Sequence, residues 1–230
     1  TKTKLLVAKY FGHFKRGEAI PKLQVVTPPI TAERRVVVYD QVELPRVFMG
    51  WLTPAAFKEG DAELGIAAQI LAGGKSSRLY KKLVYEMQIA QDVNVSQNSN
   101  ALTSMFIIDV TARPGHTAQE IEAAIDEELN QLRSTVPSAK EMERVLNSFE
   151  TATLSHIEKI GGYGLANVLN YYNHYLGDPG YLQKDIERYR KVTADDVQRV
   201  AASQLQNNAR AVVYGVPGVK DLGAEVPTLP

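Results

Sequence analysis

The order of strand-like and helix-like segments constrains the fold of this 230-residue chain more than any other feature. Runs rich in β-branched and aromatic residues predict five strands, at 35–40, 46–52, 92–97, 105–112 and 209–216. Most of the helical patterns lie between the fourth and the fifth of these runs. Such an order does not alternate as βαβ units do. It therefore predicts an α+β fold, with an antiparallel β-sheet flanked by helices on one face.

Glycines and capping residues mark where the predicted helices begin and end. The first core helix covers 61–71 and ends at the pair Gly73-Gly74, after which Ser76 or Ser77 can cap a helix that runs to about Met87. Two capping boxes open later helices: Thr117 with Glu120, and Ser138 with Glu141. The second of these helices is expected to reach Ile160, before Gly161-Gly162 interrupts it. Further helices are predicted at 165–176, 181–189 and 194–205.

The pattern divides the chain into three parts. Residues 1–33 are interpreted as the end of a preceding domain, with a helix over 1–11, followed by a linker rich in proline and glycine. Residues 34–217 form the folded domain, and 218–230 form a polar tail. A helix at the very start indicates that the chain begins inside a larger polypeptide, so a targeting signal can lie upstream.

Composition excludes several classes of function. The chain has 26 basic and 26 acidic residues, and this balance argues against a dedicated nucleic-acid binder. It has no cysteine, which removes disulfides and thiolate metal sites. No apolar run approaches the roughly 20 residues that span a bilayer.

The sequence offers no recognisable catalytic centre. The four histidines form neither His-x-x-Glu-His nor its inverse, so no zinc site is predicted in this chain: His13, His116, His156 and His174. The run 73–76, GGKS, lacks the first glycine of a phosphate loop and follows a helix rather than a strand. The carboxylates of 126–128 are interpreted as a solvated helix face, with Glu127 near Gln131.

Arg78 and Tyr85 are the candidate substrate-binding residues. In an α-helix, seven residues return to within about 20° of the starting direction and rise about 10 Å. The two side chains are therefore expected on one face, two turns apart, where both could donate hydrogen bonds to the carbonyl oxygens of one extended peptide. The same spacing also occurs on ordinary amphipathic helices, and periodicity alone favours that simpler interpretation.

A family resemblance favours the peptide-binding interpretation. The segment 73–86, GGKSSRLYKKLVYE, resembles a Ser-Arg-Leu-Tyr stretch in the second half of M16 subfamily B zinc peptidases of the pitrilysin and mitochondrial processing peptidase type. It also resembles the end of the glycine-rich loop in the non-catalytic subunit of mitochondrial processing peptidase. Weaker similarities follow in the family's order, at 9–17, 111–116, 177–179 and 192–197. Together they cover the chain from about residue 5 to 216.

The resemblance implies a C-terminal, non-zinc domain with the LuxS/MPP-like metallohydrolase fold. Zinc would be held by an N-terminal M16 domain of the same or another subunit, in a homodimer or a heterodimer that encloses a chamber. Arg78 and Tyr85 match, in spacing and context, a family Arg/Tyr pair that contacts the peptide near the scissile bond. Family resemblance alone suggests the periplasm.

Two functions follow from the resemblance. In the favoured one, this chain holds unfolded peptides for cleavage by a zinc-bearing partner domain and is inactive by itself. In the alternative, it belongs to a non-catalytic assembly or peptide-binding subunit, similar to the core proteins of the respiratory bc1 complex. A stand-alone domain without a peptide role would require the Arg78 and Tyr85 match to be accidental.

Overall fold

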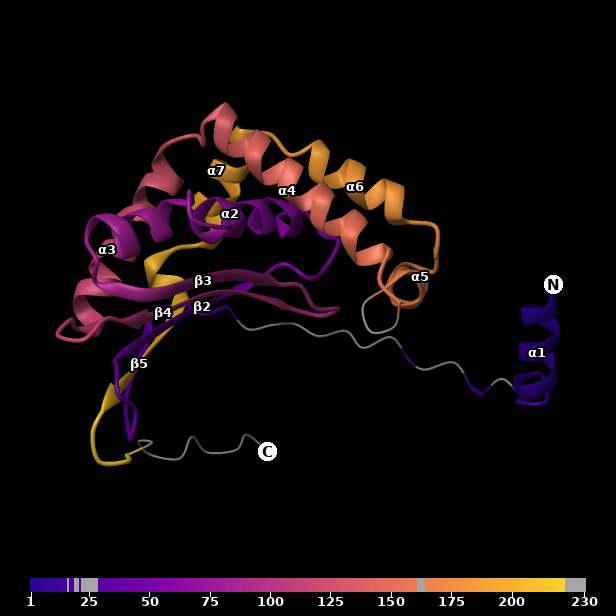
Figure 1. Ribbon diagram of the computed structural model, residues 1–230, viewed down its shortest axis with the longest axis horizontal. Coiled ribbons are helices and arrows are strands. Elements are labelled where there is room, and N and C mark those ends of the chain that lie inside the picture. Colours follow the sequence, from indigo (N-terminus) through magenta and orange to yellow (C-terminus); the bar gives the residue numbers. More distant parts are fainter. Residues whose placement is uncertain (16, 19–20, 22–28, 161–163, 222–230) are drawn as a thin grey trace.

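The computed structural model describes residues 1–15, 17–18, 21, 29–160 and 164–221. A five-stranded sheet carries helices on one face, as Figure 1 shows for α2, α3, α4 and α7. The predicted α+β fold is therefore confirmed. The strands are β1 (Arg34–Asp40), β2 (Arg46–Thr53), β3 (Ala90–Asn98), β4 (Ser104–Ala112) and β5 (Arg210–Pro217). The α-helices are α1 (Lys2–Phe11), α2 (Asp61–Ala72), α3 (Ala118–Ser134), α4 (Ala139–Ile157), α5 (Leu165–Leu176), α6 (Leu182–Arg190) and α7 (Ala194–Gln204). A π-helix, η1, covers Tyr80–Glu86, and a short 3-10 turn, η2, covers Asn207–Ala209.

The sheet is mixed rather than wholly antiparallel. Its strand order is β1-β5-β2-β4-β3, and β1 pairs with β5 in parallel while the other three pairs are antiparallel. The last strand enters between β1 and β2, which run in opposite directions, so it must lie parallel to one of them. Sequence order alone could not reveal this insertion.

Along the central strands, every second side chain is buried on the side of the sheet that the helices cover. Val47, Met49 and Trp51 of β2 are at most 1% exposed, and they pair with Val110, Ile108 and Phe106 of β4, which are fully buried. The intervening side chains point to the open face of the sheet. Burial on one face only is the pattern expected of a sheet covered by a single helix layer.

Helices α3 and α4 begin at the predicted capping residues. In α3 and α4, Thr117 and Ser138 each accept a hydrogen bond from the backbone N–H three residues on, and both capping boxes are confirmed. Helix α4 ends at Ile157, slightly short of the predicted Ile160, and the predicted break at Gly161-Gly162 lies outside the described residues.

Helix α1 contains no buried residue. The division of the chain at residues 33 and 217 stays a prediction, and much of the tail 218–230 lies outside the described residues. In the described part of the chain, no helix combines the length and the apolar character that crossing a bilayer requires.

Candidate functional site

The glycine pair after α2 sets the direction of the chain into the candidate site. Helix α2 ends at Gly73, and Gly74 has a φ of +93°, a conformation that L side chains rarely adopt. The buried hydroxyl of Ser77 donates to the Gly74 carbonyl oxygen at 2.6 Å. Ser77 directly precedes the helix that begins at Arg78, and its carbonyl oxygen accepts from the Lys81 N–H at 2.9 Å. It therefore occupies the predicted capping position, although its hydroxyl closes the turn.

The helix that carries Arg78 and Tyr85 is not a regular α-helix. The residues Tyr80–Glu86 form a π-helix, in which the Met87 N–H donates to the Lys82 carbonyl five residues back, at 2.8 Å. A π-helix has wider turns than the 3.6 residues of an α-helix, so seven residues no longer complete two turns. The α-helical spacing from which a shared face was expected therefore does not apply over Tyr80–Glu86, and the shared face itself stays a prediction.

Arg78 is held by the first turn of α4. Its Nε and Nη2 donate to the two oxygens of Glu141 at 2.6 and 3.1 Å. The side chains of Arg78 and Glu141 are 17% and 25% exposed. The hydrogen bond from Arg78 is the main reason that the pKa of Glu141 is lowered to about 2, and further bonds from Ser138 contribute. Glu141 thus caps α4 and fixes Arg78 at the same time.

Tyr85 lies in a different environment. It is 54% exposed, and its ring packs edge-on against Tyr80 with centroids 5.6 Å apart. No hydrogen bond or ring contact joins Arg78 to Tyr85 among the residues that the structure describes. The structure therefore shows no direct interaction between the two predicted residues.

All three carboxylates of the acidic stretch 126–128 of α3 bind cations, and two of the three are shielded from solvent. Lys82 of η1 donates to Glu127 at 2.7 Å and to Glu128 at 3.0 Å, and the Glu128 residue is 8% exposed. Asp126 accepts two hydrogen bonds from Arg210 of β5. The prediction of a solvated face at 126–128 therefore holds for Glu127, whose side chain is 65% exposed, but was wrong for Asp126 and Glu128, which Arg210 and Lys82 cover.

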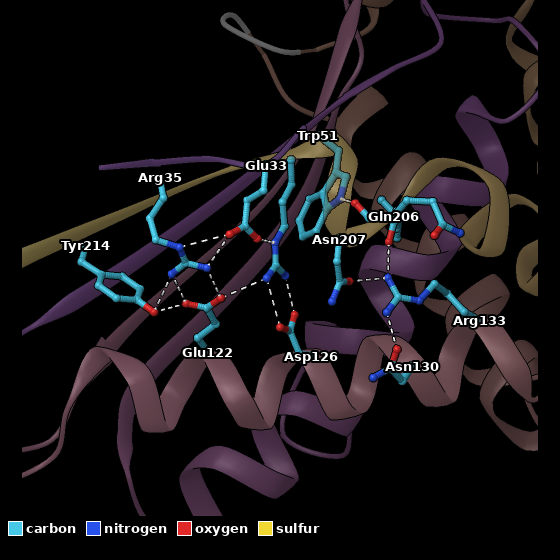
Figure 2. A network of polar contacts seen from close by, with 12 residues as sticks. Glu33, Arg35, Trp51, Glu122, Asp126, Asn130, Arg133, Gln206, Asn207 and Tyr214 are labelled. Carbon is cyan, nitrogen blue, oxygen red and sulfur yellow. Dashed lines mark hydrogen bonds and ion pairs between the residues drawn. The ribbon is translucent and has the colours of Figure 1, made fainter. Parts of the chain in front are cut away.

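A second polar group, which we call the Arg210 cluster, lies where β1 and β5 meet α3 (Figure 2). It consists of Glu33, Arg35, Glu122, Asp126, Arg210 and Tyr214. Arg210, with its side chain 3% exposed, donates to Glu33 at 2.7 Å, to Glu122 at 2.9 Å and to Asp126. Arg35 donates to both oxygens of Glu122 at 2.6 Å.

Sequence reasoning missed the Arg210 cluster. One available signal was the pair Glu122 and Asp126, spaced by four residues beside the apolar stripe of α3. A second was Arg210, which alternates into the buried face of its strand. These signals identify the cluster only when β5 is known to lie beside β1, because the carboxylates that bind Arg210 are 84 to 177 residues away in the sequence.

The described residues contain no group of three or more His, Cys, Asp or Glu side chains that could hold a metal ion. The residues present here therefore do not fit a zinc site, and the chemistry available to Arg78 and Tyr85 is binding and orientation. A guanidinium and a phenol can each donate to a carbonyl oxygen.

The chain can be compared with known proteins on this basis. The family profile described as peptidase M16 inactive domain matches residues 2–149, which is more than half of the chain. No curated protein matches. A protease from Helicobacter pylori has a TM-score of 0.84 at 22% identity, and the match covers 94% of this chain and 52% of that protein. A candidate zinc protease from Bordetella pertussis Tohama I has a TM-score of 0.67 at 25% identity, covering 78% of this chain and 97% of that one.

A ferredoxin protease solved in complex with Arabidopsis ferredoxin also shares the fold, with a TM-score of 0.70 at 16% identity over 94% of this chain and 24% of that one. This chain therefore spans about half the length of the Helicobacter protease and a quarter of the ferredoxin protease. The profile match and the fold agree with the expected similarity, although subfamily B stays a prediction. The chain belongs to the M16 peptidase family, as an inactive domain of that family.

Proposed function

We propose that this chain is the substrate-holding domain of an M16 zinc peptidase, acting with a zinc-bearing partner domain on unfolded peptides. The observation that carries the proposal is the family match to an inactive domain, together with coverage of about half of a protease. A domain of this kind would bind and orient the peptide, and the metal of its partner would supply the activated water.

Tyr85 is the more accessible of the two proposed contacts. Its exposed side chain can offer the hydroxyl to a peptide carbonyl without breaking any contact that the structure shows. Arg78 already binds Glu141 through Nε and Nη2, so those two atoms could bind a peptide only if that ion pair were released. Nη1 is a further donor of the same guanidinium, and the proposed role of Arg78 can use it without that release.

The open face of the sheet offers a place for apolar side chains of a peptide. A pocket of about 280 Å³ lies there, lined by Phe48, Met105, Ile107 and Val213 among others. Phe48 and Met105 are 37% and 42% exposed, which is high for such large apolar residues. An unfolded peptide exposes apolar side chains that could cover this surface, which supports the proposed substrate class.

The decisive experiment measures kcat/KM for a quenched fluorescent peptide with the assembled enzyme. We expect Arg78→Ala to lower kcat/KM by about 10- to 100-fold, the loss typical of one hydrogen bond that involves a charged group. Glu141→Gln is the matched control, since it weakens the ion pair but leaves the guanidinium in place. It should preserve or increase cleavage. Equal losses in both variants would show that the ion pair, rather than a peptide contact, is what matters.

The Arg78–Glu141 ion pair also favours the alternative function, a non-catalytic assembly or peptide-binding subunit in which this arginine only fixes α4. In that case the intact protein would bind unfolded peptides or partner subunits without cleaving them. A partner in the same or another subunit, and a periplasmic location, stay predictions under both functions.

A further inference from the structure

Gly50, in the middle of β2, leaves a gap in the open face of the sheet. Directly opposite residues of neighbouring strands share a face, and Gly50 pairs with Ile107 of β4 and Ala211 of β5. A Cβ at position 50 would meet no atom within 4 Å, and Gly50 is not one of the glycines with a positive φ. Neither close packing nor the backbone conformation therefore requires glycine here, and the space above it is open.

This gap is the floor of the apolar pocket on the open face. Successive side chains of a strand alternate between faces, so Phe48 and Leu52 lie on either side of the gap along β2. Ile107 and Ala211 lie on either side of it across the sheet. All the described residues that line the pocket are apolar or glycine. A charged side chain would lose its hydration there without gaining a partner, whereas an apolar side chain would be favoured.

The pocket has the size of a site for one side chain. Its volume is about 280 Å³, far above the roughly 10–15 Å³ that a single water molecule needs. Pockets that enclose whole drug-sized ligands reach roughly 300–1,000 Å³. The pocket therefore suits a part of a larger ligand, such as one large side chain of a peptide.

Polar side chains limit the apolar area around the pocket. Asp109, which lies opposite Phe48, binds Arg46. On β3, Asn94 occupies the same face of the sheet, because it lies opposite Asp109. A helix laid across this face would have to cover these polar groups, and their burial would cost free energy. The surroundings of the pocket therefore favour a single inserted side chain.

The chain itself shows which kind of side chain reaches this pocket. Ile30 lies in the segment before β1, outside any helix or strand, and its side chain is partly buried. It contributes to the lining of the pocket. An aliphatic side chain from a segment without regular structure can therefore lie against this face of the sheet.

We propose that this pocket receives one aromatic or large aliphatic side chain of a bound peptide, and that Gly50 is the residue that determines this preference. An unfolded peptide can present such a side chain, because it does not bury it in a core of its own. The inference rests on the proposed peptide-holding function and narrows the substrate class of the same domain.

The test uses the assembled enzyme and pairs of quenched fluorescent peptides that differ at one position, where a large apolar residue is replaced by alanine. For one position of the peptide, we expect the replacement to lower the wild-type kcat/KM by about tenfold or more, since a large side chain then loses its buried site. Gly50→Val fills the floor of the pocket and should abolish this difference. Gly50→Ala adds a single methyl group and should reduce the difference by less.

The matched control is Asn94→Val, which adds the same side chain to the same face outside the described lining of the pocket. It should leave the preference unchanged. Urea denaturation shows whether the variants fold. Gly50→Val should not lower the free energy of unfolding, because valine favours strands and its Cβ would meet no atom within 4 Å.

Two results would overturn the pocket while leaving the proposed function in place. One is a wild-type enzyme that cleaves both members of every pair equally well, and the other is a preference that persists in Gly50→Val. Equal loss of cleavage for both members in Gly50→Val would also overturn it, since the face would then pack against the partner domain. If no peptide is cleaved, fluorescence anisotropy compares the Kd values of the same pairs. Equal Kd values would overturn the pocket, and no binding at all would overturn the pocket and the proposed function together.

Discussion

Two arginines of this domain each bind carboxylates of a covering helix, but they differ in how firmly they are committed. Arg210 is 3% exposed and donates to three carboxylates from two directions, Glu33 before β1 and Glu122 and Asp126 on α3 (Figure 2). Arg78 is 17% exposed and binds one carboxylate, Glu141, which is itself 25% exposed. Burial and the number of partners separate a structural arginine from one that could exchange its partner.

The electrostatics support this distinction. Burial disfavours the charge of Arg210, but its bonds to Asp126 and Glu33 outweigh that effect and raise its pKa. Its loss would leave Glu122 and Asp126 with less compensating charge in a water-poor place. Glu141, if Arg78 turned away, could still be solvated and would still cap α4. A peptide could therefore compete for Arg78 at a far lower cost than for Arg210.

The largest loss of stability is expected from Arg210→Ala. We expect it to lower the free energy of unfolding by about 3 kcal/mol, because it leaves Asp126 without a cation and leaves Glu33 and Glu122 with Arg35 alone. Urea denaturation measures this change. The matched control is Arg46→Ala, which removes an ion pair with Asp109 whose arginine is 47% exposed, and it should cost at most about 1 kcal/mol. Similar losses in both variants would show that burial does not separate the two kinds of pair.

Most of the fold, but not this distinction, was accessible from the sequence. The capping boxes at Thr117 and Ser138 and the strand runs are local signals, and they predicted the helix starts and the positions of β2 and β4. The insertion of β5 beside β1 depends on contacts between distant residues, so the parallel pair and the Arg210 cluster could not be predicted.

The candidate site was predictable only in part. The sequence predicted Arg78 and Tyr85 on a helix. Arg78 lies at the start of the helical segment, and Tyr85 lies within η1. The π-helix over Tyr80–Glu86 has no clear sequence signal, because its wider turns accompany the packing of η1 against β3 and α3. The ion pair to Glu141 was likewise hidden, since the two residues are 63 positions apart.

The Arg78–Glu141 pair predicts a pH dependence. The pKa of Glu141 in the folded state is about 2, below the ordinary value of 4.5. Ionised Glu141 therefore stabilises the fold above pH 4.5, and this contribution is lost as the pH falls towards 2. We expect the free energy of unfolding to fall more steeply over this range in the wild type than in Glu141→Gln. Denaturation at a series of pH values measures the difference. Parallel curves would mean that the pair contributes nothing to stability.

A smaller effect is expected from the cap alone. Ser138→Ala removes the hydroxyl that accepts from the Glu141 N–H at 3.3 Å and donates to the Glu141 carboxylate at 2.8 Å. Loss of such a cap typically costs about 1 kcal/mol. Because the variant leaves Arg78 and its guanidinium bonds in place, peptide cleavage should be unchanged. A fall in cleavage as large as that of Arg78→Ala would indicate that the position of α4, and not the arginine itself, controls activity.

The smallest change in stability is expected at Tyr85. Tyr85→Phe keeps the ring that packs against Tyr80 and removes only a hydroxyl on an exposed side chain. The free energy of unfolding should therefore change by no more than about 0.5 kcal/mol. A fall in kcat/KM without a change in stability would then assign the hydroxyl to substrate contact, which the equivalent experiment on Arg78 cannot do so cleanly. If cleavage and stability are both unchanged, Tyr85 has no part in holding the peptide. The family's Arg/Tyr pair would then lack its tyrosine at this position.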